Sequence, residues 1–139
     1  MSHVAKIELE IRDLETLKQA CQRLNLEFME NQQTYRWYGR SVGDAPLPEG
    51  FTIEDLGKCH HAIRVPGASY EIGVVQRQGK YQLLWDNWHS GGLERILGPG
   101  AGRLKQAYAI ARVAKEARLK GYRLTEKQKN NTVQLVLTV

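Results

Sequence analysis

The strict alternation of apolar and polar side chains over residues 3–12 constrains the fold more than any other feature of the sequence. A two-residue period fits an extended strand with one buried face and does not fit a helix. The apolar side of this strand carries Ala5, Ile7, Leu9 and Ile11. A half-buried strand needs both a neighbouring strand and an apolar layer against its buried face, so the chain is expected to fold around a sheet.

Two segments show helical spacing instead. Apolar residues recur every three or four positions over residues 14–24, which predicts an amphipathic helix with Asp13 as its N-cap and Asn25 at its C-terminal end. Residues 103–120 form the longest predicted helix, and Gly121 is the glycine expected just beyond its last turn. These two helices would supply the apolar layer that the sheet requires.

The remaining extended patterns predict the other strands. They cover residues 26–30, 33–38, 59–65, 70–77, 80–87, 122–128 and 132–139. Turns are expected at Gln78-Gly79 and Asn130-Asn131, and a long loop at 39–58 contains one helical turn at 53–56. If one extended segment is not a strand, the order is β-α-β-β-β-β-α-β-β. This order predicts a single α+β domain over residues 1–139, with an antiparallel sheet and two helices packed on one face, as a ferredoxin-like variant.

The composition is that of a soluble globular domain. The 139 residues are 42% hydrophobic and 25% charged, and a chain of this length buries a core without disulfides or metals. No apolar run approaches the roughly 18 residues that a membrane span needs, and the charged N-terminal residues do not read as a signal peptide. Two cysteines, Cys21 and Cys59, suit a reducing compartment, so we expect a cytoplasmic protein without membrane association.

Positive charge is concentrated in the second half of the chain. The formal net charge is +5, and residues 95–129 alone hold ten basic and two acidic side chains. One interpretation is a surface that follows nucleic-acid phosphates, with Trp37 as a platform for base stacking. The basic residues of that surface would be Lys105, Arg112, Lys120 and Arg123. The other interpretation is a solvated helix face, and the sequence lacks the aromatic signature of RNA-recognition domains.

Cys59 and His61 are the sharpest candidates for chemistry. In an extended strand they share one face, and His3 completes a three-ligand metal site if the first strand lies centrally in the sheet. Their spacing matches no zinc-finger or ribbon motif, so hydrogen-bonded or solvent-facing histidines are the alternative. The same Cys-His pair would be a nucleophile and base only if both side chains came within hydrogen-bond reach.

A ligand-binding site is predicted from the end of the strand at 80–87 and from a glycine-rich stretch. Asp86 stands between Trp85 and Trp88, where it is either an acid or base beside indole rings or an ordinary turn residue. Backbone amides ahead of the basic helix can bind an anion. The residues expected there are Gly100, Gly102, Arg103 and Lys105. A flexible linker is the alternative for this stretch, because it lacks the P-loop pattern.

Several motifs also resemble those of a known family. Tyr70-Glu71-Ile72-Gly73 is similar to its Y-D-I-G, residues 81–88 are similar to its Y-E-L-V-A-D-x-W, and Lys120-Gly121-Tyr122 resembles its Q-G-F. The family is the hypothetical chloroplast reading frame thirty-five family, an uncharacterised domain of cyanobacteria, plastids and some bacteriophages. The resemblance implies a small stand-alone domain without a known activity, in the cytoplasm, the plastid stroma or the cytoplasm of a viral host.

We therefore expect an uncharacterised binding or accessory module rather than an enzyme, with no cofactor. The loop at 39–58, the strand end at 85–90 and the glycine-rich stretch would hold an anionic small ligand or a protein partner. One alternative is a nucleic-acid-associated protein that uses residues 95–129. A second alternative is a small metal-binding protein or enzyme that uses Cys59, His61 or Asp86. The identity of the partner and the oligomeric state are left open by the sequence.

Overall fold

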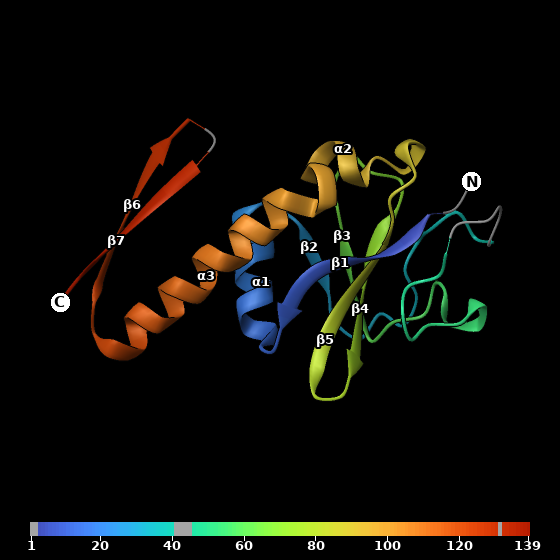
Figure 1. The fold of residues 1–139 in the computed structure, drawn as a ribbon, viewed down its shortest axis with the longest axis horizontal. Coiled ribbons are helices and arrows are strands. Elements are labelled where there is room, and N and C mark those ends of the chain that lie inside the picture. Colours follow the sequence, from blue (N-terminus) through green and yellow to red (C-terminus); the bar gives the residue numbers. More distant parts are fainter. Residues whose placement is uncertain (1–2, 41–45, 131) are drawn as a thin grey trace.

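The computed structural model describes residues 3–40, 46–130 and 132–139, and its architecture is mixed α+β (Figure 1). The strands are β1 (Val4–Ile11), β2 (Glu27–Met29), β3 (His61–Arg64), β4 (Glu71–Arg77), β5 (Lys80–Asp86), β6 (Arg123–Lys129) and β7 (Thr132–Thr138). The helices are α1 (Leu14–Arg23), α2 (Leu93–Leu97) and α3 (Gly102–Lys120), and short 3₁₀ turns lie at Ile53–Asp55, His89–Gly91 and Pro99–Ala101. The predicted class is confirmed, and so is the predicted order of strands and main helices. Among the described residues, no helix is both long and apolar enough to cross a membrane.

Five strands form one antiparallel sheet in the order β1-β5-β4-β3-β2. The first strand pairs with a strand far away in the sequence, so that Val4 lies opposite Asp86 and Ile7 lies opposite Leu83. The register shifts between Ile7 and Ile11, which marks a bulge in β1. β1 is therefore an edge strand, and the central position that the metal prediction required is wrong.

α1 and α3 cover one face of this sheet. The apolar side of β1 contributes Ile7 and Ile11, as the alternation predicts. The buried side chains that meet them come from β5 and the two helices: Leu83, Trp85, Leu17, Cys21, Leu104 and Tyr108. Each large apolar side chain buried in this way contributes about 1.5–3 kcal/mol relative to an exposed position.

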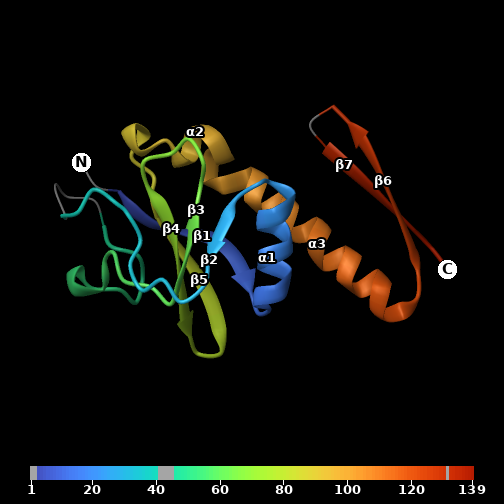
Figure 2. The same cartoon turned by 180° about the vertical axis from the view of Figure 1, so that it is seen from behind.

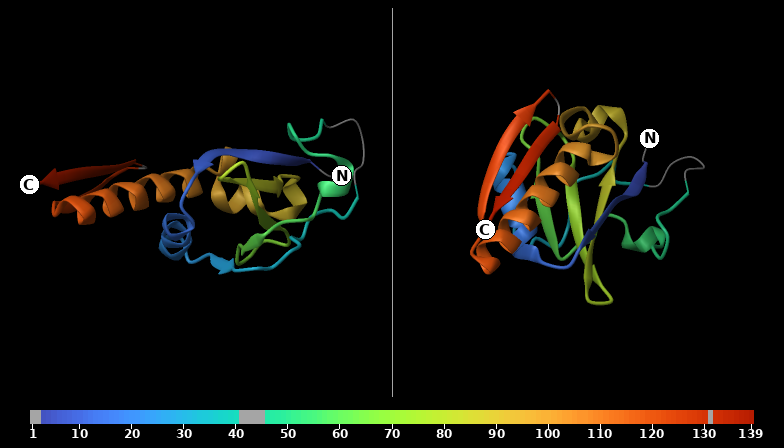
Figure 3. Two further views of the ribbon diagram at one scale, coloured as in Figure 1. Left: turned by 90° about the horizontal axis from the view of Figure 1, so that it is seen from below. Right: turned by 60° about the vertical axis from the view of Figure 1, so that its left-hand side comes forward.

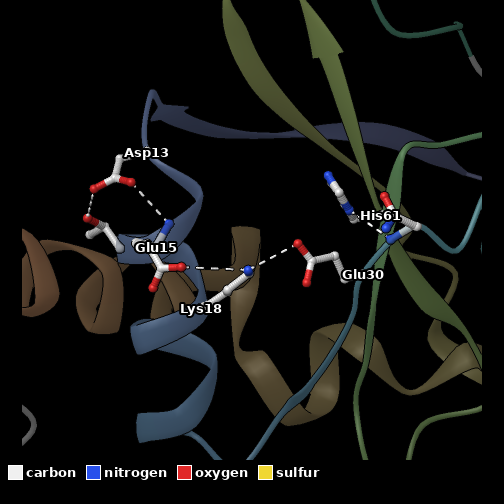
Figure 4. Close-up of polar contacts among 7 residues, drawn as sticks. Asp13, Glu15, Lys18, Glu30 and His61 are labelled. Atoms are coloured by element: carbon white, nitrogen blue, oxygen red, sulfur yellow. Dashed lines mark hydrogen bonds and ion pairs between the residues drawn. The ribbon is translucent and has the colours of Figure 1, made fainter.

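The start of α1 is fixed by Asp13, the predicted N-cap. Its carboxylate accepts the backbone N–H of Glu15 at 3.0 Å and the hydroxyl of Thr16 at 2.7 Å (Figure 4). The ammonium of Lys115 on α3 also contacts this carboxylate, so one side chain both caps α1 and ties it to α3. The hydrogen bond from Lys115 lowers the pKa of Asp13 most, and the hydrogen bonds from Thr16 and Glu15 lower it further. Asn25 ends the helix in the left-handed conformation (φ 58°), also as predicted.

The other face of the sheet is covered by the long segment between β2 and β3. Its described part carries Tyr35, Phe51, Leu56 and Cys59 onto strand residues of this face, such as Leu84. Figures 1 and 2 show this segment on the side of the sheet away from α1 and α3. The segment has little regular structure. The prediction of a strand at 33–38 is wrong, because the strand pairing there is limited to an isolated bridge between Thr34 and Lys58. The predicted helical turn is present at Ile53–Asp55. Part of the predicted loop at 39–58, namely residues 41–45, lies outside the described residues.

The last two strands form a separate sheet. β6 and β7 pair as an antiparallel hairpin, and neither joins the five-stranded sheet (Figure 3). α3 has 19 residues and is about 28 Å long, which carries the chain past the edge of the larger sheet. Gly121 (φ 71°) then turns the chain in the left-handed conformation that glycine favours. Asn130 (φ 52°) begins the predicted hairpin turn, while Asn131 lies outside the described residues.

Replacing Gly73 with alanine should destabilise the fold, because the new methyl group would overlap the ring of Tyr35, which lies on β4 at this point. We expect a loss of about 1–3 kcal/mol in the free energy of unfolding, measured by urea denaturation. Gly102→Ala is the matched control, since Gly102 has helical dihedral angles (φ −54°, ψ −36°) and open space around it. Equal stability of the two variants would contradict this account of how Tyr35 packs.

Candidate functional site

The carboxylate of Asp86 is the most deeply buried charged group of the described structure, at 0% exposure. Its Oδ1 accepts the backbone N–H groups of His3 at 3.0 Å and Trp88 at 3.1 Å, and its Oδ2 accepts that of Tyr38 at 3.0 Å. A buried carboxylate requires such compensation, because an unpaired charge in the interior is strongly unfavourable. Asp86 thus joins three distant parts of the chain and forms the turn after β5, which supports its interpretation as a turn residue.

The two tryptophans predicted to flank Asp86 lie in different environments. Trp85 is 2% exposed and belongs to the core beneath the helices, so it is not accessible to a ligand in this structure. Trp88 is half-buried, and its indole stacks on the imidazole of His3 with ring centres 5.2 Å apart. His89 contacts the same indole at 4.4 Å. The strand end therefore presents Trp88 in contact with two histidines, while Asp86, two residues earlier in the sequence, is fully buried.

A second buried carboxylate, which the sequence analysis missed, lies on the next strand. Glu71 accepts the backbone N–H of Arg36 at 2.9 Å and pairs with the Arg36 guanidinium at 3.4 Å. Gln32 donates to the same carboxylate at 3.3 Å. Glu71 and Asp86 together fasten residues 32–38 to the sheet. The signal in the sequence was a single acidic residue within the otherwise apolar run that follows Tyr70.

Cys59, weighed as a nucleophile only if a base came within reach, is buried and protonated. Burial raises the pKa of its thiol to about 11, and the sulfur donates to the carbonyl of Gln32 at 3.2 Å. Burial likewise raises the pKa of Tyr35, its neighbour in the same cluster, to about 12. A reactive cysteine needs a lowered pKa and access to solvent, and Cys59 has neither. The arrangement fits a small core residue.

The three predicted metal ligands do not converge. His61 packs on the Phe28 ring, and its Nδ1 accepts the backbone N–H of Asn31 at 2.9 Å, beside the Lys18–Glu30 ion pair (Figure 4). Cys59 lies in the cluster on the opposite face, because regular pairing in β3 begins only at His61 and the two-residue alternation does not extend back to Cys59. His3 lies at the sheet edge against Trp88. In the described ranges, no three His, Cys, Asp or Glu side chains are placed to hold a metal ion.

The glycine-rich stretch is an ordered connection between α2 and α3. Gly102 donates its amide to the carbonyl of Pro99, and the amide of Ala101 binds the carbonyl of Gly98 at 3.0 Å. Arg103 donates to the carbonyl of Ile96 at 2.9 Å, and the ammonium of Lys105 lies beside Gly100. The backbone amides of Ala101 and Gly102 and the guanidinium of Arg103 are thus hydrogen-bonded to carbonyl groups of the chain itself. Across the part of the chain that the structure describes, no hydrogen bond or ion pair connects this stretch with Asp86 or Trp88.

The predicted basic residues lie on α3 and on the hairpin of β6 and β7. We call this part of the chain, residues 102–139, the arm. The arm holds nine basic and two acidic side chains, whereas residues 1–101, the body, hold 11 and 13. Arg112 and Arg123 are exposed, Lys105 is half-buried and Lys120 pairs with Glu116 at 3.1 Å. Trp37, the predicted stacking platform, packs on the opposite side of the sheet against Gly57. The four predicted bases therefore lie on α3 and the hairpin, whereas the tryptophan lies apart from them.

Prominent hollows of the described surface lie along α1 and α3. A groove of about 510 Å³ between the end of β1 and α3 is lined by Glu10, Arg12, Asp13, Thr16, Tyr108, Arg112, Lys115, Glu116 and Leu119. Two hollows of about 470 and 370 Å³ lie where the hairpin approaches α1 and α3. None of the three is lined by Trp85, Asp86 or Trp88. These three hollows therefore lie away from the predicted ligand site.

Comparison with known families matches residues 20–138 to the family described as "Protein of unknown function (DUF1257)". The chain belongs to this family, because the match covers most of its length. No curated protein and no solved structure matches the chain. Family membership therefore identifies an uncharacterised domain and leaves its function to be argued from the structure.

Removing the charge of Asp86 should weaken the fold. In Asp86→Asn the side-chain amide nitrogen must face at least one of the three N–H donors, whichever way it is turned. We expect the free energy of unfolding in urea to fall by about 2–4 kcal/mol. Glu8→Gln removes the same charge from an exposed position of β1 and should change stability little. If both variants matched the wild type, Asp86 would not fasten the chain.

The neutral form of His61 should make stability depend on pH. Burial lowers the pKa of His61, so below about pH 6.5 the unfolded chain binds this proton more readily than the folded chain. The free energy of unfolding should therefore fall as the pH drops from about 6.5 toward the pKa of His61 in the folded chain. It should be fully restored above about pH 6.5, the pKa of histidine in the unfolded chain. In His61→Gln, which keeps an acceptor for Asn31, this part of the pH dependence should disappear. An unchanged pH profile in that variant, or an NMR titration of His61 above about 6.5, would contradict the assignment.

Proposed function

We propose that this member of the DUF1257 family is an accessory module that docks onto an acidic protein surface through its basic arm. The observation that carries the proposal is the separation of charge between the two parts of the molecule. The arm has a formal net charge of +7 and the body one of −2. An electrostatic field of this kind steers association and orients the two partners.

The outer face of the hairpin supplies a row of cations. Arg123, Lys127 and Lys129 alternate along β6, so they project from the same face, and all three are exposed. Their partners across the hairpin are Thr138, Gln134 and Thr132, which are neutral. These cations make no ion pair with another described residue, so they are available to an acidic partner.

Apolar side chains next to these cations favour a protein partner over nucleic acid. Val136, which shares the face of the hairpin that carries these cations, is 38% exposed, and Leu119, near the end of α3, is 73% exposed. Protein interfaces combine such apolar contacts with a charged rim, whereas phosphate backbones are bound by charge and base stacking. In the arm Tyr108 is buried and Tyr122 half-buried, so the described residues offer no fully exposed aromatic ring for stacking.

We further infer that the matched family is the chloroplast reading frame family that the motifs resemble, with its occurrence in cyanobacteria, plastids and phages. Supporting this, the residues that carry the resemblance include Glu71 and Asp86, the two buried carboxylates on which the fold depends. A reducing compartment, such as the cytoplasm or plastid stroma, suits the two free and buried thiols of Cys21 and Cys59.

Charge reversal on the hairpin tests the proposed docking. We expect the triple variant Arg123→Glu, Lys127→Glu, Lys129→Glu to bind an acidic helical peptide with leucines along one face roughly tenfold more weakly than the wild type. Three exposed charges at about 0.5 kcal/mol each account for this factor. Leu119→Ser should weaken binding of the same peptide without affecting binding of DNA. Fluorescence anisotropy of labelled peptide and labelled DNA at one salt concentration measures both.

The matched control reverses three exposed cations of the body, in Lys58→Glu, Arg64→Glu, Lys80→Glu, and should keep the wild-type affinity for the peptide. Equal weakening by both triple variants would contradict the proposal, because net charge alone would then decide binding. Tighter binding of DNA than of peptide, with no effect of Leu119→Ser on either, would identify a nucleic-acid-binding protein instead.

A further inference from the structure

Among the strands that the structure describes, every sheet edge but one is protected against pairing with other chains. β1 carries Lys6, Glu8 and Glu10 and is bulged, and β2 has only three residues. Both are ordinary devices against edge-to-edge association. β6 carries Arg123, Glu126, Lys127 and Lys129 along its length. The remaining edge belongs to β7, and it has none of these features.

β7 is a seven-residue strand without a charged side chain. Its seven described residues read Thr-Val-Gln-Leu-Val-Leu-Thr and include no ionisable side chain and no proline. All seven are exposed or half-buried, and among the described strands β7 pairs only with β6. A two-stranded hairpin is marginally stable in water and gains most from a further strand. An open edge of this composition favours the addition of another strand.

The sequence of β7 is complementary to itself in the antiparallel direction. If two copies pair with Leu135 opposite Leu135, Thr132 lies opposite Thr138, Val133 opposite Leu137 and Gln134 opposite Val136. These are Thr–Thr and mostly apolar pairs, which are favourable cross-strand neighbours. The apolar pairs also share one face, because Val133, Leu135 and Leu137 alternate along the strand.

The charges on β6 also favour β7 as the edge through which two copies pair. Pairing two copies through β6 would bring Arg123, Lys127 and Lys129 against like charges of the second chain, which is unfavourable. Pairing through β7 keeps the two β6 strands at the outer edges, separated by both β7 strands. The combined sheet would also join the two rows of cations into one longer basic face.

We propose that two copies of this chain associate through antiparallel pairing of β7, forming a four-stranded sheet in the order β6-β7-β7-β6 around a two-fold axis at Leu135. This self-association goes beyond the proposed docking function and does not depend on it. A two-fold axis makes the same edge serve both copies, as in most homodimers.

The oligomeric state of matched variants tests the proposal. By analytical ultracentrifugation we expect the wild type to form a species of about twice the chain mass of 15.8 kDa in a concentration-dependent manner. In Val136→Lys two lysines meet near the two-fold axis, and the dimer dissociation constant should rise roughly tenfold or more. Thr125→Lys adds the same charge opposite Val136 within the hairpin but on β6, and should leave dimerisation unchanged.

Cysteine cross-linking tests the register. Leu135→Cys should form a disulfide-linked dimer under mild oxidation, because residue 135 faces itself across the axis. Val133→Cys alone should not, whereas it should link to a second protein carrying Leu137→Cys. The native Cys21 and Cys59 are buried and do not compete. The proposal would be overturned if the wild type stayed monomeric at every concentration, or if Leu135→Cys failed to cross-link. It would also be overturned if Val136→Lys and Thr125→Lys had equal effects on dimerisation while their circular dichroism stayed intact.

Discussion

The buried carboxylate of Asp86 is the point at which the body of this protein is held together. Its three hydrogen bonds come from the residue before β1, from the irregular segment after β2 and from the turn after β5. No other described residue connects these three parts through hydrogen bonds. Because the charge is fully removed from solvent, each N–H contributes more than it would at the surface. The edge strand β1 and the covering segment therefore depend on one acidic side chain.

The covering segment shows why this matters. Residues 32–38 have the aromatic and β-branched character of a strand, yet two of their backbone donors, Arg36 and Tyr38, bind Glu71 and Asp86 instead of a neighbouring strand. Tyr35, just before Arg36, packs with its ring on Gly73, where no larger residue fits. Side-chain carboxylates thus replace the hydrogen-bond ladder, and an irregular segment covers a sheet face that a helix would cover in a simpler fold.

Much of the fold could be predicted from local patterns because those patterns report burial directly. The alternation in β1, the helical spacing of α1 and α3 and the turn at Gln78-Gly79 all correspond to the structure. The alternation of side chains in β5 also predicts that Trp85 and Asp86 face opposite sides of the sheet. The prediction of the ligand site did not take this into account. The partners of Asp86 could not be predicted, since Tyr38 is 48 and His3 is 83 residues away from it in the sequence. The separation of β6 and β7 from the main sheet depends on where α3 ends in space, which periodicity does not report.

The pairing of β1 with β5 also sets the order in which the chain can acquire its structure during synthesis. β1 and α1 are synthesised well before their partners β5 and α3. Until then Ile7, Ile11 and Leu17 have no partner to bury them, and closing so long a loop is slow. The hairpin of β6 and β7, by contrast, needs only its own two neighbouring strands. β1 is therefore more exposed than this hairpin to chaperones and to misassociation while the protein is being made.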